Sequence, residues 1–355
     1  MADDSRLSSV VDDNGQLFGL INVIDAAVLL LAILILAAGA LLWAPLSAGD
    51  ETETRYVTIE LEPQPAFIAE QIREGDEMSP GGTGGTLTIT DIYQYSPEDE
   101  INTIVRAEVT GTALGSGNED ADAIRFDGSH MRFGSTINLE MPNYAASGTV
   151  VSIDREDSSL DTGTESFVLD MEVDQRTART IEEGDGLQVG DRDLTVVETV
   201  TVYPIPNDAD TQRVFVGVTG SVQFEGNTPL LGTQPVRDGL DLTVETQQYE
   251  LTGIVDRVGS PEESGTPDTR TATVELSDVS PARLDALEAG LTEGTGDLTT
   301  AEIIELDDRT LAVELTVREL DDGTVRFRGE QVEIGQEIAF DFGTTTVEGE
   351  LTALD

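Results

Sequence analysis

The chain has 355 residues and a formal net charge of −51, because 70 acidic residues stand against 19 basic ones, all of them arginine. This balance excludes nucleic acid as a partner, since binding to phosphates needs clustered Lys and Arg. The hydrophobic fraction of 38% still supports folded cores and argues against disorder. Concentrated salt would screen the self-repulsion of so acidic a fold. We therefore predict an extremely halophilic protein, with a polyanionic mimic or a calcium sponge as the alternative.

A continuously apolar segment from Ala26 to Ala44 predicts a transmembrane helix over residues 26–46, behind an N-terminal tail of residues 1–25. Trp43 stands where an interfacial anchor is expected, and Pro45 ends the helix. A cleaved signal peptide is the alternative, but its apolar region would be too long and Leu46-Ser47-Ala48 is a poor cleavage site. We expect an uncleaved single-pass anchor in the cell membrane.

The orientation of the anchor has little support from charge, because only Arg6 and Arg55 lie close to the apolar segment. A short N-terminal tail before a single span usually stays in the cytoplasm. We therefore expect the region after about residue 50 to be extracytoplasmic.

The tail leads into the anchor with the run Asp13-Asn14-Gly15-Gln16-Leu17-Phe18-Gly19-Leu20-Ile21-Asn22-Val23-Ile24-Asp25. This run resembles the opening motif, Asp-x-Gly-x-Leu-Phe-Gly-x-Ile-Asn-x-Ile-Asp, of a family of single-span membrane proteins of unknown function from bacteria and archaea. The resemblance covers the anchor and the first unit behind it, and it implies no chemistry. Together with the acidic composition it suggests a haloarchaeal member. The apolar residues of the run could instead form an amphipathic lead-in helix at the membrane interface (Leu17, Phe18, Ile21 and Ile24).

The rest of the chain repeats one unit of about 100 residues three times, at residues 55–155, 166–259 and 270–355. Each copy ends on a Gly-punctuated pattern that closes with a strand opened by Gly148, Gly253 or Gly349. An aromatic or polar residue precedes that glycine in the aligned pattern: Tyr144, Tyr249 and Thr346. The repeated residues are turns, caps and core positions, so a fold is being repeated.

Each copy is predicted to open with a strand (56–61, 167–173 and 272–276) followed by a short helix (65–72, 175–183 and 280–290). Gly75, Gly184 and Gly290 then end the helices as left-handed caps. The strand–helix–Gly-Asp order resembles the Gly-Asp box of cradle-loop barrels, although Leu291 replaces the Asp in the third copy. We predict a mainly β protein with three tandem small β-barrel or sandwich domains, cradle-loop-barrel-like. Acidic linkers at 155–165 and 259–268 would join them into a stacked or beaded rod.

Reactive residue types are scarce. There is no cysteine, no P-loop is possible without lysine, and His130 would have to serve any Ser-His-Asp triad. We expect His130 to be an ordinary loop or strand-face residue. Two acidic clusters could hold calcium, but neither fits the twelve-residue calcium loop. They are Glu119, Asp120, Asp122 and Asp127 in one loop, and Asn207, Asp208 and Asp210 in another.

These observations assign no catalytic residue, no cofactor and no cofactor-binding residue, and they leave metal binding open. Repetition and the anchor favour a non-enzymatic structural scaffold at the membrane, in envelope organisation or cell-shape maintenance, that self-assembles or binds protein partners. An adaptor subunit of an export or transport complex is one alternative. A module that binds a small ligand or calcium is the other.

Overall fold

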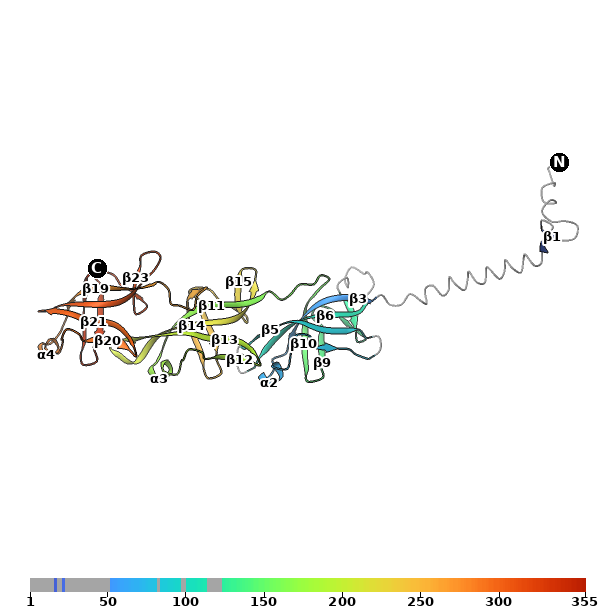
Figure 1. The fold of residues 1–355 in the computed structure, drawn as a ribbon, viewed down its shortest axis with the longest axis horizontal. Helices are drawn as coiled ribbons and strands as arrows, with labels where there is room; N and C mark the ends of the chain where they lie inside the picture. The colour runs from blue at the N-terminus through green and yellow to red at the C-terminus, as the bar shows by residue number, and fades with distance from the viewer. Residues whose placement is uncertain (1–15, 18–20, 23–51, 82–83, 97–99, 114–122) are drawn as a thin grey trace, which may run out of the picture.

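The computed structural model describes residues 16–17, 21–22, 52–81, 84–96, 100–113 and 123–355. Three curled antiparallel sheets of eight strands each follow one another along the long axis of the molecule (Figure 1). We call them repeats 1, 2 and 3, and they are built from residues 52–154, 162–258 and 266–354. The prediction of three tandem, mainly β units is confirmed.

The nine elements of each repeat occur in one order. Repeat 1 contains β3 (Thr52–Leu61), α2 (Ala66–Ala69), β4 (Glu77–Met78), β5 (Thr86–Tyr95), β6 (Asn102–Ala113), β7 (Ile124–Phe126), β8 (Ser129–Met131), β9 (Thr136–Glu140) and β10 (Ala145–Asp154). Repeat 2 contains β11 (Thr162–Asp174), α3 (Gln175–Ala178), β12 (Gly186–Val189), β13 (Arg192–Ile205), β14 (Asp208–Glu225), β15 (Thr228–Leu231), β16 (Gln234–Pro235), β17 (Asp241–Glu245) and β18 (Glu250–Val258). Repeat 3 contains β19 (Thr266–Leu276), α4 (Pro281–Leu284), β20 (Thr292–Thr295), β21 (Leu298–Asp307), β22 (Thr310–Glu319), β23 (Val325–Phe327), β24 (Glu330–Gln331), β25 (Glu337–Asp341) and β26 (Thr346–Leu354).

The strand order in repeat 1 is β4-β5-β6-β3-β10-β9, with the hairpin β7–β8 attached to β6, and repeats 2 and 3 have the same topology. This order is symmetric about the β6–β3 pair, because a hairpin flanks each side of it. Each hairpin is also entered through a similar turn. The amide of Gly75 donates to the Ile89 carbonyl before β4, and the amide of Gly134 donates to the Val150 carbonyl before β9. Every repeat is therefore two similar halves interleaved in one sheet.

The glycines of the closing pattern allow a strand to pass close to its neighbour. A Cβ atom on Gly148, Gly253 or Gly349 would lie 2.7, 2.9 or 2.5 Å from a carbonyl oxygen of the opening strand of the same repeat. Three residues after each of these glycines, the closing strand carries a β-bulge against that opening strand. Bulges increase local twist, so this device helps the sheet to curl.

Three details of the predicted elements are wrong. The helices are single turns of four residues, and Gly75, Gly184 and Gly290 lie several residues beyond them. Each glycine has a φ of 86–90° and lies in a β-turn. Its amide donates to a carbonyl of the long strand β5, β13 or β21 and not to the helix, so the glycine is not a helix cap. The third member of the Tyr144 and Tyr249 set is Thr345, because Phe342 bonds to Thr345 as Met141 bonds to Tyr144.

The tyrosine at this position is the hydrogen-bond partner of the Asp that Leu291 replaces in repeat 3. The Tyr144 hydroxyl donates to Asp76 Oδ2 at 2.8 Å, and the Tyr249 hydroxyl donates to Asp185 Oδ2 at 2.5 Å. Burial, together with this hydrogen bond to a carboxylate, raises the pKa of both tyrosines. In repeat 3 both members of the pair have changed together, to Leu291 and Thr345.

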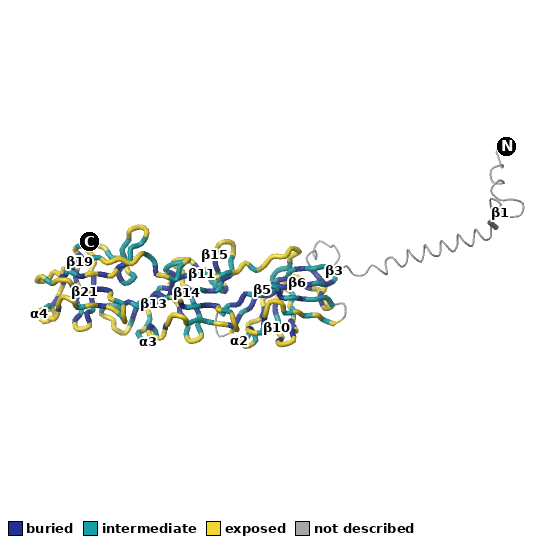
Figure 2. Tube along the Cα trace, in the orientation of Figure 1, coloured by how far each residue is buried: buried dark blue, intermediate teal, exposed yellow. Residues whose placement is uncertain are grey.

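The predicted linkers are shorter than expected, since β11 begins at Thr162 and β19 begins at Thr266. Each repeat has its own apolar core, centred on residues such as Ile59, Leu169 and Val274. Two smaller apolar clusters lie where repeats meet. Figure 2 shows the buried residues running along the strands, with exposed residues at the turns. The repeats are therefore stacked rather than beaded.

At the N-terminal end the structure describes a minimal antiparallel pair, β1 (Gln16–Leu17) and β2 (Ile21–Asn22), with Leu17 opposite Ile21. Leu17 and Ile21 of the alternative lead-in helix lie in this pair, while its other two residues, Phe18 and Ile24, lie outside the described residues. The predicted transmembrane segment, residues 26–46, lies outside the described residues. Within the described part of the chain, no helix has the length and apolar character that crossing a membrane requires.

Candidate functional site

The structure does not gather the residues that the sequence singled out. His130 lies exposed on a strand face in β8, with Nε2 3.5 Å from Arg125 Nη2. Asp127 lies at the tip of the β7–β8 turn, while residues 119–122 of its cluster are outside the described residues. Asp208 uses Oδ1 to accept the backbone amides of Asp210 and Thr211. Among the residues that the structure describes, no three His, Asp or Glu side chains are placed to hold a metal ion.

What the fold does build is a concave surface in each repeat, which we call the socket. In repeat 1 it lies between the hairpin β7–β8, the short strand β4 and strand β9, and in the other repeats it lies between the equivalent strands. In repeat 1 it is formed by Met78, Phe126, Asp127, Ser129, Asn138 and Glu140. The equivalent positions, fixed by the common ladder register, are Leu187, Leu231, Gly232, Gln234, Thr243 and Glu245 in repeat 2. In repeat 3 they are Glu293, Phe327, Arg328, Glu330, Ala339 and Asp341.

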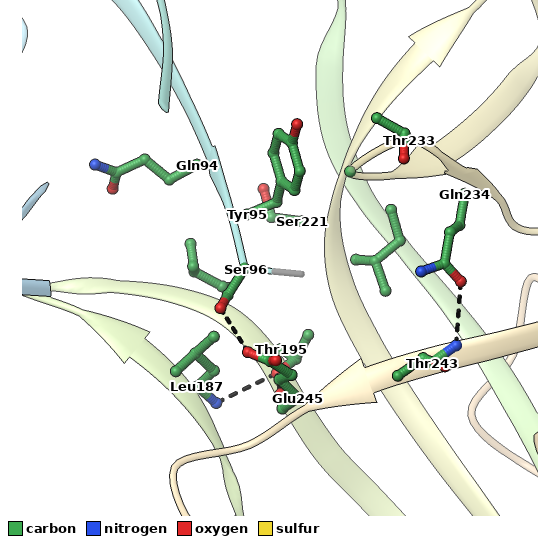
Figure 3. A pocket seen from close by; sticks show the side chains of 13 residues that line it. Gln94, Tyr95, Ser96, Leu187, Thr195, Ser221, Thr233, Gln234, Thr243 and Glu245 are labelled. Atoms are coloured by element: carbon green, nitrogen blue, oxygen red, sulfur yellow. Dashed lines mark hydrogen bonds between the residues drawn. The ribbon is translucent and has the colours of Figure 1, made fainter. Parts of the chain in front are cut away.

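The socket of repeat 2 is filled by the end of β5 from repeat 1 (Figure 3). The Tyr95 ring packs on the hairpin turn, where a Cβ on Gly232 would lie 2.4 Å from Tyr95 Cδ2. Ser96 Oγ donates to Glu245 Oε2 at 2.5 Å. Thr195 Oγ1 holds the same glutamate by donating to its carbonyl at 2.6 Å. Only about 40 Å³ of cavity remains between the two repeats.

Buried polar contacts reinforce this first joint. The Tyr93 hydroxyl accepts the Gly232 amide at 2.9 Å and donates to the Leu230 carbonyl at 3.2 Å. Burial raises the pKa of Tyr93 to about 12, so the hydroxyl stays protonated. Arg192 of repeat 2 donates to Gln94 Oε1 at 2.6 Å and to the Ile72 carbonyl at 2.9 Å. An apolar cluster from both repeats seals the contact: Ala69, Ile101, Val189 and Leu194.

The second joint uses the same surfaces with different chemistry. Phe215 of repeat 2, only 1% exposed, packs on the β23–β24 turn, where a Cβ on Gly329 would lie 2.5 Å from its ring. Arg213 is held by Asp170 at 2.8 and 2.6 Å and reaches Glu330 of repeat 3 at 3.3 Å. Pro206, from the β13–β14 turn, enters the socket of repeat 3, where a cavity of about 170 Å³ remains.

The linker of the second joint is also fixed. Arg318 donates to three consecutive linker carbonyls, those of Glu263, Ser264 and Gly265, at 2.7–2.9 Å. Glu263 itself is 4% exposed and accepts a hydrogen bond from the Tyr203 hydroxyl at 2.8 Å. Burial raises the pKa of the Glu263 carboxyl to about 7, against the opposing effects of Tyr203 and of the Arg318 charge. Arg326 of repeat 3 pairs with Asp256 of repeat 2 at 2.6 Å.

The socket of repeat 1 has no such occupant among the residues that the structure describes. Its cavity of about 700 Å³ is lined by repeat 1 alone. Three of the five methionines of the chain line it, Met78, Met131 and Met141, together with His130. A Cβ on Gly128 at the hairpin turn would meet nothing within 4 Å. Phe133, two residues after Met131 in the chain, is 76% exposed.

Sequence reasoning missed the sockets because their parts are far apart in the chain. The one signal that could have found them is the aromatic residue near the end of the long hairpin, at Tyr93, Tyr95 and Tyr203. Strand ends of that kind normally meet solvent, so tyrosines there indicate burial by another unit.

Comparisons with known proteins show a similarity to one family over part of the chain. No curated protein and no solved structure matches this chain. A family model does match, over residues 9–154, and the matched region ends at the last residue of β10. Repeats 2 and 3 therefore lie outside it. Over its N-terminal segment and first repeat, the chain is similar to a family described as a domain of unknown function (DUF4330).

Proposed function

We propose that this protein is a non-enzymatic scaffold of a haloarchaeal cell envelope. In this proposal residues 26–46 anchor the chain in the cell membrane as a single pass, and the repeats project outside the cell. The rod would hold protein partners at a fixed distance and orientation, in envelope organisation or cell-shape maintenance. The excess of acidic residues over arginine supports the halophilic origin.

The observation that carries the proposal is the packing of both joints. Loose linkers would let three domains reorient freely. Here Arg192 ties the first joint through Gln94, and Arg318 ties the second through consecutive linker carbonyls. A chain that keeps its domains in fixed relation is suited to spacing and alignment, which a tethered binding domain does not need.

The finer resemblance to cradle-loop barrels belongs to the same proposal. Its support is the interleaving of two similar halves in each sheet, with a glycine turn before each hairpin, at Gly75 and at Gly134. The likeness concerns architecture and assigns no activity.

Two experiments test the proposal. Protease added to intact cells should degrade the repeats, and full protection would contradict the extracytoplasmic orientation. A deletion strain should show altered shape or surface, with a tagged copy at the envelope. Normal cells, combined with co-purification of a transporter, would favour the adaptor of a transport complex instead. Calcium that raises the melting temperature in high salt would favour a calcium-binding module.

A further inference from the structure

The three sockets differ in occupancy although they are equivalent in position. The sockets of repeats 2 and 3 receive the tip of the long hairpin of the preceding repeat. The socket of repeat 1 has no preceding repeat in the described chain. Its cavity of about 700 Å³ compares with about 40 Å³ at the first joint and with cavities of about 170 and 390 Å³ at the second. The chain therefore shows, twice, what kind of group this surface accepts.

Both occupants share a chemistry. Each places an aromatic ring on the glycine of the hairpin turn, Tyr95 on Gly232 and Phe215 on Gly329. The first occupant adds a hydroxyl donor, Ser96, for the acidic Glu245, and the second adds a proline at the tip, Pro206. The rings bury apolar area, and Ser96 satisfies the Glu245 carboxylate.

The socket of repeat 1 keeps the features that these occupants use. Gly128 stands in the hairpin turn at the position of Gly329, and Asp127 stands at that of Gly232. Glu140 stands at the position of Glu245. Methionine side chains such as Met78 and Met131 adapt to differently shaped partners. An aromatic hairpin tip with a hydroxyl donor would therefore find its contacts here.

A second copy of this chain does not fit that description. The hairpin tip of repeat 3, which would have to enter the socket in a head-to-tail polymer, is formed by Asp307, Asp308 and Arg309. All three are exposed, and the tip has neither an aromatic ring nor a proline.

We infer that the socket of repeat 1 binds a partner protein through a protruding β-hairpin tip of that partner, one that carries an aromatic residue and a hydroxyl donor at the contact. The inference rests on the proposed scaffold function only in supplying the place where a partner joins the rod. Binding continues the stacking of the rod, with the partner in the position of a preceding repeat.

The test uses the full chain in detergent micelles, in the salt concentration at which it is folded. The probe is a hairpin peptide with the sequence of residues 92–104, closed by a disulfide between cysteines added at its ends. Its Tyr95 and Ser96 are the residues that fill the socket of repeat 2. A peptide with the sequence of residues 305–312, the distal tip, is the control probe. We expect the first peptide to bind, by fluorescence anisotropy, and the control peptide to bind at least about tenfold more weakly. Equal binding of the two, or no binding of the first, would overturn the inference.

Two variants locate the binding. Ser129→Trp places a bulky side chain in the socket at an exposed position, and should weaken peptide binding by about tenfold or more. Thr149→Trp, also exposed and on the same sheet but outside the socket, should leave it unchanged. An unaffected Ser129→Trp variant would refute the site. So would a photoreactive group at Ser129 that crosslinks to residues 1–51 of its own chain. None of these results depends on membrane orientation or cell shape, so failure here is distinct from failure of the scaffold proposal.

Discussion

The two joints of the rod use one geometry and two kinds of chemistry. In the first joint no ion pair links the two repeats among the contacts described above. Tyr93 and Tyr95 stack, and each charged group meets a neutral partner, as Arg192 does on the side-chain amide of Gln94. In the second joint charges of both signs meet across the contact, in the pairs Arg213–Glu330 and Arg326–Asp256. The socket thus fixes where a hairpin tip docks, while the side chains on the tip remain free to vary.

Because of this difference, we expect the stabilities of the two joints to respond differently to pH and to salt. Neutral buried contacts change little with pH or salt, whereas exposed ion pairs weaken as salt screens them. Glu330 is exposed, so its pair with Arg213 contributes little in concentrated salt. Glu263 is buried and the side chain of the half-buried Asp256 is only 6% exposed, so their interactions persist in salt but depend on protonation. The second joint is accordingly the pH-sensitive one.

Removing the aromatic anchor of the second joint should have the largest effect. The Phe215→Ala substitution empties a fully buried site against Tyr203 and Gly329, and we expect a loss of about 3–5 kcal/mol in the free energy of unfolding. Chemical denaturation measures the loss, and hydrogen exchange should localise it to β23 and β24. The matched control is Phe133→Ala, an exposed aromatic, with a change within about 0.5 kcal/mol. Equal effects of the two substitutions would mean that the second joint is not packed.

Acidification should tighten the second joint. Because the folded pKa of Glu263, about 7, exceeds its ordinary value of 4.5, the folded state binds more protons between these two pH values. The free energy of unfolding therefore rises as pH falls from 7 to 4.5, by up to about 3 kcal/mol. The groups that face this carboxyl are Tyr203, Arg318, Asp256 and Arg326.

The comparison that isolates this titration is between the wild type and Glu263→Gln, measured by denaturation at several pH values in one salt concentration. Carboxyls that do not interact with residue 263 titrate alike in both proteins, so the difference between the two curves reports Glu263 and its neighbour Asp256. That difference should grow as pH rises through 7, where the wild type carries a buried charge and the variant does not. A pH-independent difference would show that Glu263 is solvated in solution.

The sequence predicted the repeated architecture because its signals are local. Alternating residues in β3 place Val57, Ile59 and Leu61 on the core face, and glycines with positive φ mark the turns. The helices were overestimated because apolar spacing continued beyond the single turn of Ala66–Ala69 into the following loop, where Ile72 is buried without being helical. Apolar spacing predicts which residues are buried, but it does not predict the residue at which the helical backbone hydrogen bonds end.

The sockets could not be predicted, because they depend on contacts between residues more than a hundred positions apart, such as Tyr93 with Gly232. The acidic loops drew attention as calcium sites, although Asp208 serves to cap its own turn. Glu263 resembled any other acidic linker residue, and only the fold shows that Tyr203 and Arg318 enclose it. In so acidic a chain, composition hides the few carboxylates that are buried.

Removal of the Tyr93 hydroxyl in the first joint should have the smallest effect on the free energy of unfolding. It also tests most directly whether the first joint is less sensitive to pH than the second. In Tyr93→Phe the ring still fills its site, but the buried Gly232 amide loses its acceptor, at a cost of about 1–2 kcal/mol. The control is Tyr95→Phe, whose hydroxyl makes no hydrogen bond among the described residues, and we expect a negligible change. The Tyr93→Phe loss should be the same at pH 5 and pH 8, since the tyrosine pKa of about 12 lies far above both. A loss that varies with pH would contradict the neutral character of the first joint, and the two joints would then respond alike.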